Sequence, residues 1–166
     1  LYEMDAAGNA NLIGLTVMEN DAAGRFLGNR VGPKWGSLLE PEVAAFLFKQ
    51  GILDFVERRV PAALTDLLPG YIGPLGLDLM VHRRPDGGLA LKHVVELNVR
   101  LTMGRIALKL LKKSTPQRSG RFRIHRMDKL SKAEIESLQT GTTEGGTITL
   151  NDPKAARAFL AVWEII

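Results

Sequence analysis

Two segments in which apolar and polar residues alternate, separated by a turn, constrain the fold of this chain most strongly. The first segment covers residues 75–83, the second covers residues 89–101, and Pro85-Asp86-Gly87-Gly88 lies between them. Successive side chains of a β-strand point to opposite faces, and a turn of this composition typically joins antiparallel strands. The sequence therefore predicts a β-hairpin whose two faces differ in polarity.

Polar residues should gather on one face of this hairpin. Glu96, Asn98 and Arg100 alternate with apolar residues in the second segment, and Asp78 lies between two leucines of the first. A half-exposed antiparallel sheet also shows such alternation. Taken alone, the pattern therefore also permits a solvated face on which Arg100 pairs with one of the acids.

The register of the hairpin suggests a stronger interpretation. A three-residue loop over 86–88 would place Asp78 directly opposite Glu96. Like charges at directly opposed positions destabilise a sheet, so a compensating cation is expected. Magnesium prefers oxygen ligands, takes few protein carboxylates and completes its octahedron with water and phosphate oxygens. We therefore expect Asp78, Glu96 and Asn98 to bind a divalent metal ion.

An amphipathic helix should follow the hairpin at once. Its apolar stripe is formed by Met103, Ile106, Ala107, Leu110 and Leu111. Thr102 is the candidate N-cap. Arg100 therefore stands just before a helix N-terminus, where backbone N–H groups and the helix dipole favour anions.

The order Gly76-Leu77-Asp78, a hairpin, and then Glu96-Leu97-Asn98-Val99-Arg100 resembles the C-terminal part of the ATP-grasp superfamily. The preceding residues 70–75 and the closing Thr102-Met103-Gly104 add to the likeness, which is good over residues 70–111. The resemblance implies an α+β fold with an antiparallel sheet and flanking helices. It also implies that residues 1–166 form a single domain, the C-terminal portion of an ATP-grasp domain.

The resemblance further implies an activity and a set of site residues. Asp78, Glu96 and Asn98 would bind Mg²⁺ or Mn²⁺, and Arg100 would be a catalytic residue that also contacts ATP. Arg30, near the end of an earlier strand, would be a second contact to the nucleotide. The implied reaction activates a small-molecule carboxylate as an acyl-phosphate and transfers it to an amine or similar nucleophile, as in an ATP-dependent carboxylate–amine ligase.

Members of this superfamily also have an upstream half with phosphate-gripping lysines and a glycine-rich loop, and no such pattern is recognisable here. The chain opens at Leu1 in a run of expected strands. We therefore expect it to be a fragment that works with the upstream N-terminal half of the same protein and is inactive alone.

The rest of the chain predicts a meander followed by helices. The expected strands are Leu1–Asp5, Leu12–Glu19 and Arg25–Val31, joined by glycine-containing turns. Helical periodicity extends from Pro41 to Leu68, with interruptions expected at Gly51 and Pro61. Further elements expected are a strand over 121–127, a short helix opening at Ser131, a strand over 147–150 and a helical turn from Asp152.

Charge and composition leave one alternative open. The net charge is +4, and nine basic residues lie between Lys109 and Lys132, so the chain could instead be a non-enzymatic module that binds nucleic acid or another polyanion. Only 6% of residues are aromatic and few interrupt this stretch, so we do not expect nucleic-acid binding. The chain has no cysteine and no apolar run of about 18 residues, so we expect a cytoplasmic protein without a membrane contact.

Overall fold

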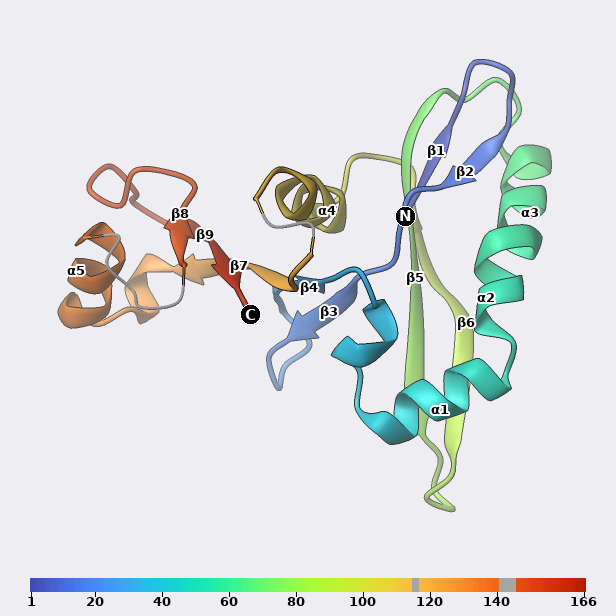
Figure 1. Cartoon of the computed structure of the whole chain (residues 1–166), viewed down its shortest axis with the longest axis horizontal. Coiled ribbons are helices and arrows are strands. Elements are labelled where there is room, and N and C mark those ends of the chain that lie inside the picture. The colour runs from blue at the N-terminus through green and yellow to red at the C-terminus, as the bar shows by residue number, and fades with distance from the viewer. Residues whose placement is uncertain (115–116, 141–145) are drawn as a thin grey trace. The chain divides into compact units, whose positions relative to one another are not determined.

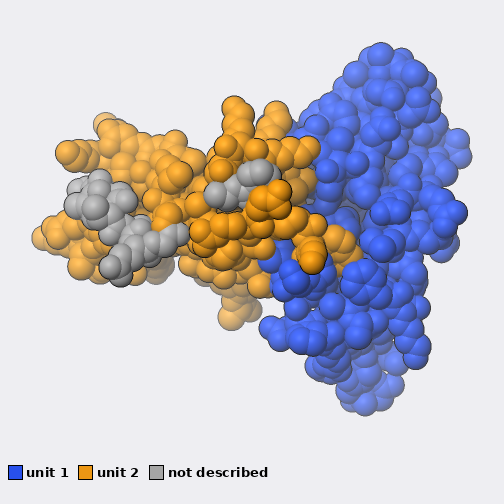
Figure 2. Space-filling view, in the orientation of Figure 1, with its two compact units in different colours: residues 1–15, 36–105 blue, residues 16–35, 106–166 orange. Residues whose placement is uncertain are grey.

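The computed structural model describes residues 1–114, 117–140 and 146–166, with the side chains of 139 and 140 left aside. Contacts divide the chain into two compact units (Figure 2). Unit 1 comprises residues 1–15 and 36–105, and unit 2 comprises residues 16–35 and 106–166. Each unit has its own antiparallel sheet and helices, which confirms the α+β class. The expected single domain over 1–166 stays a prediction.

Unit 1 is built on a four-stranded sheet with the order β2-β1-β5-β6 (Figure 1). All neighbouring strands are antiparallel. The long hairpin β5–β6 is the element expected from the alternating segments. The strands are β1 (Tyr2–Met4), β2 (Ala10–Leu12), β5 (Gly73–Arg83) and β6 (Leu89–Asn98).

The helical region of unit 1 has the expected interruption at Gly51, where φ is 69° and a side chain would be strained. At Pro61 the predicted interruption does not break the helical path. Pro61 cannot donate a backbone hydrogen bond, and it lies at the start of α3, directly after a π-helical turn. The segments are the short helix at Trp35–Leu38, α1 (Pro41–Lys49), α2 (Ile52–Asp54), the π-turn at Phe55–Arg59 and α3 (Val60–Leu67).

The core of unit 1 lies between α3 and the sheet. Val60 and Leu64, one helical turn apart, pack in one cluster with residues of β1, β2 and β5. The Tyr2 hydroxyl, itself in the core, donates a 2.9 Å hydrogen bond to the Val56 carbonyl. The buried members of this cluster are Tyr2, Met4, Ala10, Val60, Leu64 and Leu75.

Unit 2 is built on a five-stranded sheet with the order β3-β4-β7-β9-β8. Its strand β9 pairs with both β7 and β8. The sequence pattern did not predict a strand there, so that part of the prediction was incomplete. The strands are β3 (Val17–Asn20), β4 (Phe26–Val31), β7 (Gly120–Arg126), β8 (Ile148–Thr149) and β9 (Phe159–Ile165). The helices are α4 (Met103–Ser114), whose residues up to Arg105 belong to unit 1, the short helix at Met127–Lys129 and α5 (Lys132–Thr140).

The first third of the chain does not form one meander, as expected, but two hairpins in two different sheets. β1 and β2 pair in unit 1, whereas β3 and β4 pair in unit 2. The expected strand over Leu12–Glu19 is interrupted between Leu12 and Val17, and the chain passes from one unit to the other there. The prediction of one continuous strand over Leu12–Glu19 was therefore wrong.

Buried aromatic and aliphatic side chains pack on the sheet of unit 2. Trp163 and Val31 are completely buried, and Phe122 is nearly so. Gly120 allows the Trp163 ring to lie against β7, because a Cβ at this position would be 2.2 Å from Cζ2 of that ring. Among the helices that the structure describes, none has the combined length and apolar character needed to cross a bilayer.

Candidate functional site

The β5–β6 hairpin places Asp78 directly opposite Glu96, as predicted. The loop lies one residue earlier than expected, since the Arg84 N–H donates to the Gly88 carbonyl at 2.8 Å. Beyond the loop, a β-bulge places three residues of β6, 93–95, opposite a single residue of β5. The bulge changes the register by two residues, so the predicted pair forms although the predicted loop was wrong.

The four predicted residues of the hairpin come together on one face of the sheet. Asn98 is only 8% exposed, and its Nδ2 donates to Asp78 Oδ2 at 3.4 Å. Arg100 Nη2 donates to Asn98 Oδ1 at 2.9 Å. Asn98 thus bridges an acid and a guanidinium, with Glu96 opposite Asp78. Glu96 and Arg100 are exposed, as the solvated alternative expects, but Arg100 contacts Asn98 instead of pairing with an acid.

Electrostatics at this site disfavour a second negative charge. Burial, and then the neighbouring charge of Glu96, raise the pKa of Asp78, while the N-terminal ammonium of Leu1 and then Arg100 partly oppose this shift. Among the described residues, neither Asp78 nor Glu96 has a basic side chain within ion-pair distance. We call Asp78, Glu96, Asn98 and Arg100 the hairpin site; it has two opposed carboxylates without a direct cationic partner.

Two further charged residues, which the sequence pattern did not single out, border this face. Glu3 lies on β1 opposite Pro74, on the same side of the sheet as Asp78. Arg105 Nη2 lies 2.6 Å from Glu3 Oε2, and its Nη1 donates to the Tyr2 carbonyl at 3.4 Å. The polar position of Glu3 between two apolar residues was the available signal. Its place beside the hairpin depends on the pairing of β1 with β5.

The helix after the hairpin begins at Met103, as expected. The Thr102 carbonyl accepts a 3.1 Å hydrogen bond from the Arg105 N–H, but the Thr102 hydroxyl makes no hydrogen bond to a described residue. Thr102 is therefore not a side-chain cap. Its Cγ2 instead approaches Gly76, where a Cβ would lie 2.8 Å away. A glycine on β5 thus allows the start of α4 to approach the sheet closely.

Arg30 lies in unit 2, whereas the hairpin site lies in unit 1. Its Nε is 3.1 Å from one carboxylate oxygen of Glu19, and the other oxygen is 3.2 Å from Arg121 Nε. Arg121 Nη1 is also 3.5 Å from Glu164 Oε2. We call Glu19, Arg30, Arg121 and Glu164 the charged row. Arg30 therefore has an acidic partner, and its expected contact to ATP stays a prediction.

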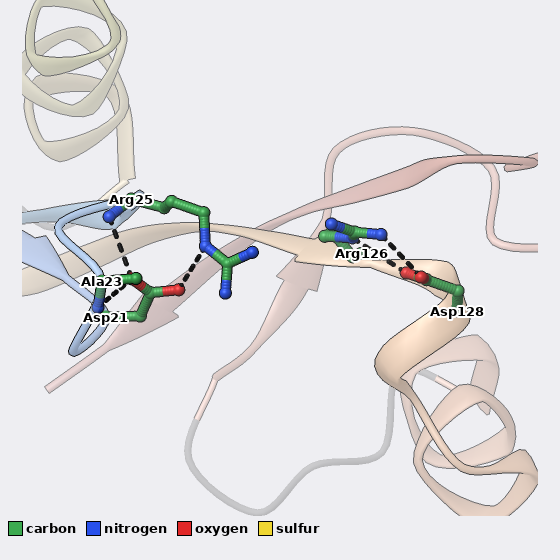
Figure 3. A network of polar contacts seen from close by, with 5 residues as sticks. All are labelled: Asp21, Ala23, Arg25, Arg126 and Asp128. Atoms are coloured by element: carbon green, nitrogen blue, oxygen red, sulfur yellow. Dashed lines mark hydrogen bonds and ion pairs between the residues drawn. The ribbon is translucent and has the colours of Figure 1, made fainter.

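The basic stretch over 109–132 is partly neutralised in the structure. Arg121 belongs to the charged row, and the guanidinium of Arg126 makes hydrogen bonds of 2.9 and 2.7 Å to Asp128. Figure 3 shows this pair beside a similar one, in which Arg25 Nε lies 2.7 Å from Asp21 Oδ2. Two of the predicted basic residues thus have acids as their partners, which weakens the polyanion alternative without testing it.

Oxygen donors define what the hairpin site can bind. Across the described parts of the chain, no three histidine, cysteine or acidic side chains form a metal cluster. The hairpin site has only two acidic side chains, and its third oxygen donor is the amide of Asn98. Such a set suits a hard cation that keeps water or phosphate oxygens as further ligands.

Comparison with protein-family models, curated proteins and solved structures finds no match for the chain.

Proposed function

We propose that this chain is the metal-binding part of an ATP- and magnesium-dependent ligase. The reaction would activate a carboxylate as an acyl-phosphate and transfer it to an amine or similar nucleophile. One observation carries the proposal: Asp78 and Glu96 are directly opposed, and no basic side chain of the described residues pairs with either. The ATP-grasp resemblance of residues 70–111 supplies the nucleotide and the ligation.

The donor set of the hairpin site fits a divalent cation. The raised pKa of Asp78 reflects burial and the adjacent charge of Glu96, and a cation between the two carboxylates would relieve the second cause. Asn98 Oδ1 accepts a hydrogen bond from the Arg100 guanidinium and its Nδ2 donates to Asp78, so the amide would have to turn for its oxygen to join the two carboxylates at the ion. Asp78, Glu96 and Asn98 would hold the ion, and the ion would neutralise phosphate charge.

Arg100 would act beside the metal ligands. Its guanidinium is anchored to Asn98 and is exposed at the end of the hairpin, close to the start of α4. A fixed cation at this place stabilises negative charge that develops on a transferred phosphoryl group, and such charge stabilisation is the main contribution of proteins to this chemistry. A segment that grips ATP would have to complete this site.

Manganese binding by the 166-residue chain tests the metal site directly. In a titration followed by electron paramagnetic resonance, we expect one Mn²⁺ ion per chain and at least about tenfold weaker binding by Glu96→Gln. Glu40→Gln removes an exposed glutamate of the same unit and should bind Mn²⁺ like the parent chain. Equal affinity of the Glu96→Gln variant would show that the hairpin site is not the metal site.

ATP turnover tests the ligase assignment separately. In a protein that includes the upstream half, Glu96→Ala should abolish ATP hydrolysis or transfer, whereas Glu40→Ala should leave it unchanged. If Mn²⁺ binds at the hairpin site but turnover survives Glu96→Ala, the metal site stands and the ligase assignment fails. A crystal soaked with Mn²⁺ and a nucleotide would then show which ligand the ion accompanies.

A further inference from the structure

An apolar pocket of about 210 Å³ opens on the helix-covered side of the unit 1 sheet. Phe55 and Leu64 contribute from the helical segment, and Leu77, Val94 and Leu97 contribute from the hairpin. Of the described residues that line the pocket, Arg59 alone carries a charge. The pocket is smaller than those that enclose drug-sized ligands, roughly 300–1,000 Å³, so it suits a small molecule or one short chain.

The pocket is formed where two irregular backbone segments meet. The π-turn at Phe55–Arg59 contributes Phe55 and Arg59, and the bulge at 93–95 contributes Val94. Without the bulge, Val94 would share the face of Glu96, two positions away; with it, Val94 lines the pocket together with Leu97. π-turns and bulges occur often at functional sites, because each re-aims side chains that a regular helix or strand would place elsewhere.

The exposed guanidinium of Arg59 lies near the ring of Phe55, another residue that lines the pocket. Its Cζ lies 5.7 Å from the centroid of the Phe55 ring, and that ring is packed edge-on against His93 at 4.8 Å. In the part of the chain that the structure describes, no acid pairs with Arg59, whereas the preceding Arg58 lies 2.7 Å from Asp54. Arg58 therefore has an acidic partner, whereas Arg59, which lines the pocket, has none among the described residues.

The pocket is distinct from the hairpin site. Leu77 pairs with Leu97, and Asp78 pairs with Glu96 one position further along the strands. Adjacent positions point to opposite faces, so the apolar pocket and the acidic residues lie on opposite sides of the same sheet. A ligand of this pocket would not contact the carboxylates.

We propose that the pocket binds a small apolar monocarboxylate, with its hydrocarbon part among the leucines and its carboxylate on Arg59. A single guanidinium matches one carboxylate through two parallel hydrogen bonds. A phosphate ester carries more charge and would require further donors, which the apolar lining does not offer. This proposal does not rest on the ligase function.

Titration of the 166-residue chain with straight-chain fatty acids, followed by amide NMR shifts, tests the proposal without ATP or metal. Lengthening the acid from hexanoate to octanoate should tighten binding about fourfold per methylene while the pocket still has room. Octanol, which lacks the charge, should bind about tenfold more weakly than octanoate. The shifts should concentrate at residues 55–64 and 93–97.

Two arginine variants separate the proposed contact from general attraction. Arg59→Gln should weaken octanoate about tenfold and leave octanol unchanged, whereas Arg58→Gln should leave both unchanged. Ala63→Leu, which narrows the pocket from a lining position, should weaken both ligands. Equal loss in the two arginine variants, equal binding of octylammonium, or no shifts with millimolar octanoate would overturn the proposal. Loss of Mn²⁺ binding in Glu96→Gln, with octanoate binding retained, would keep the two proposed sites separate.

Discussion

Both sheets place like charges directly opposite each other, but only one of them compensates these charges with its own side chains. In unit 2, Arg30 is paired with Arg121 across β4 and β7, and Glu19 reaches both. In unit 1, Asp78 is paired with Glu96, and neither has an ion-pair partner among the described residues. The arginine pair is therefore compensated by acids of its own sheet, whereas no described side chain forms an ion pair with either carboxylate.

This difference separates a structural charge cluster from a candidate binding site. Directly opposed like charges cost stability in both sheets. In the charged row, Glu19 and Glu164 offset that cost through ion pairs of 3.1 to 3.5 Å. In the hairpin site, the guanidinium of Arg100 donates to Asn98 instead of pairing with an acid. A cation from solution would offset the repulsion between Asp78 and Glu96, as Glu19 offsets the repulsion between Arg30 and Arg121.

The largest effect is expected for Glu19→Gln, which removes the acid shared by Arg30 and Arg121. The side chains of these arginines are about 30% exposed, so their charges are partly desolvated and would repel each other. We expect unit 2 to lose about 2 kcal/mol of unfolding free energy, less than for a fully buried pair. Urea unfolding followed by tryptophan fluorescence measures this, with Glu136→Gln on the exposed face of α5 as the control. A loss no larger than in the control would mean that the charged row is not a stabilising cluster.

An intermediate effect is expected when Mg²⁺ or Mn²⁺ is added. Binding to the folded chain alone should raise its stability by about 1.4 kcal/mol at tenfold the dissociation constant. The shift in the melting temperature of unit 1 should disappear in Glu96→Gln and persist in Glu19→Gln. An equal shift in all three proteins would indicate general ionic effects and would remove the contrast between the two sheets.

The smallest effect is expected for Asp78→Asn, which keeps an acceptor for Asn98 and removes one of the opposed charges. Because the folded-state pKa of Asp78 is raised, its contribution to stability is complete below the unfolded pKa of about 3.9 and is lost as pH rises through the folded pKa. The variant should therefore be more stable than the parent at pH 7, by about 0.5 kcal/mol. The two should converge near pH 3 in urea unfolding. A variant that is less stable at pH 7 would contradict repulsion between the acids.

The hairpin site was predictable because its information is local. Alternation assigns Asp78, Glu96, Asn98 and Arg100 to one face, and a hairpin brings its own strands together without help from distant residues. The loop position was wrong by one residue, and the bulge was not foreseen. The predicted pair forms because the two-residue shift at the bulge offsets the two-residue shift that the earlier loop introduces.

Elements that depend on distant partners were less predictable. The strand β9 has an apolar sequence without clear alternation, because it is buried within the sheet between β7 and β8. The run around Gly14 read as one strand, but its two ends join different sheets. Local propensity cannot distinguish these outcomes, since pairing partners decide them.

The sequence by itself determined the hairpin, the polar face on which its four candidate residues lie, and the helix that follows it. Spacing within one short segment was enough for each of these. Only the tertiary structure decided that Glu3 borders that face, that Arg30 is paired with Glu19, and that Arg59 stands at an apolar pocket. Each of these depends on contacts between segments far apart in the chain, or on backbone irregularities that periodicity does not reveal.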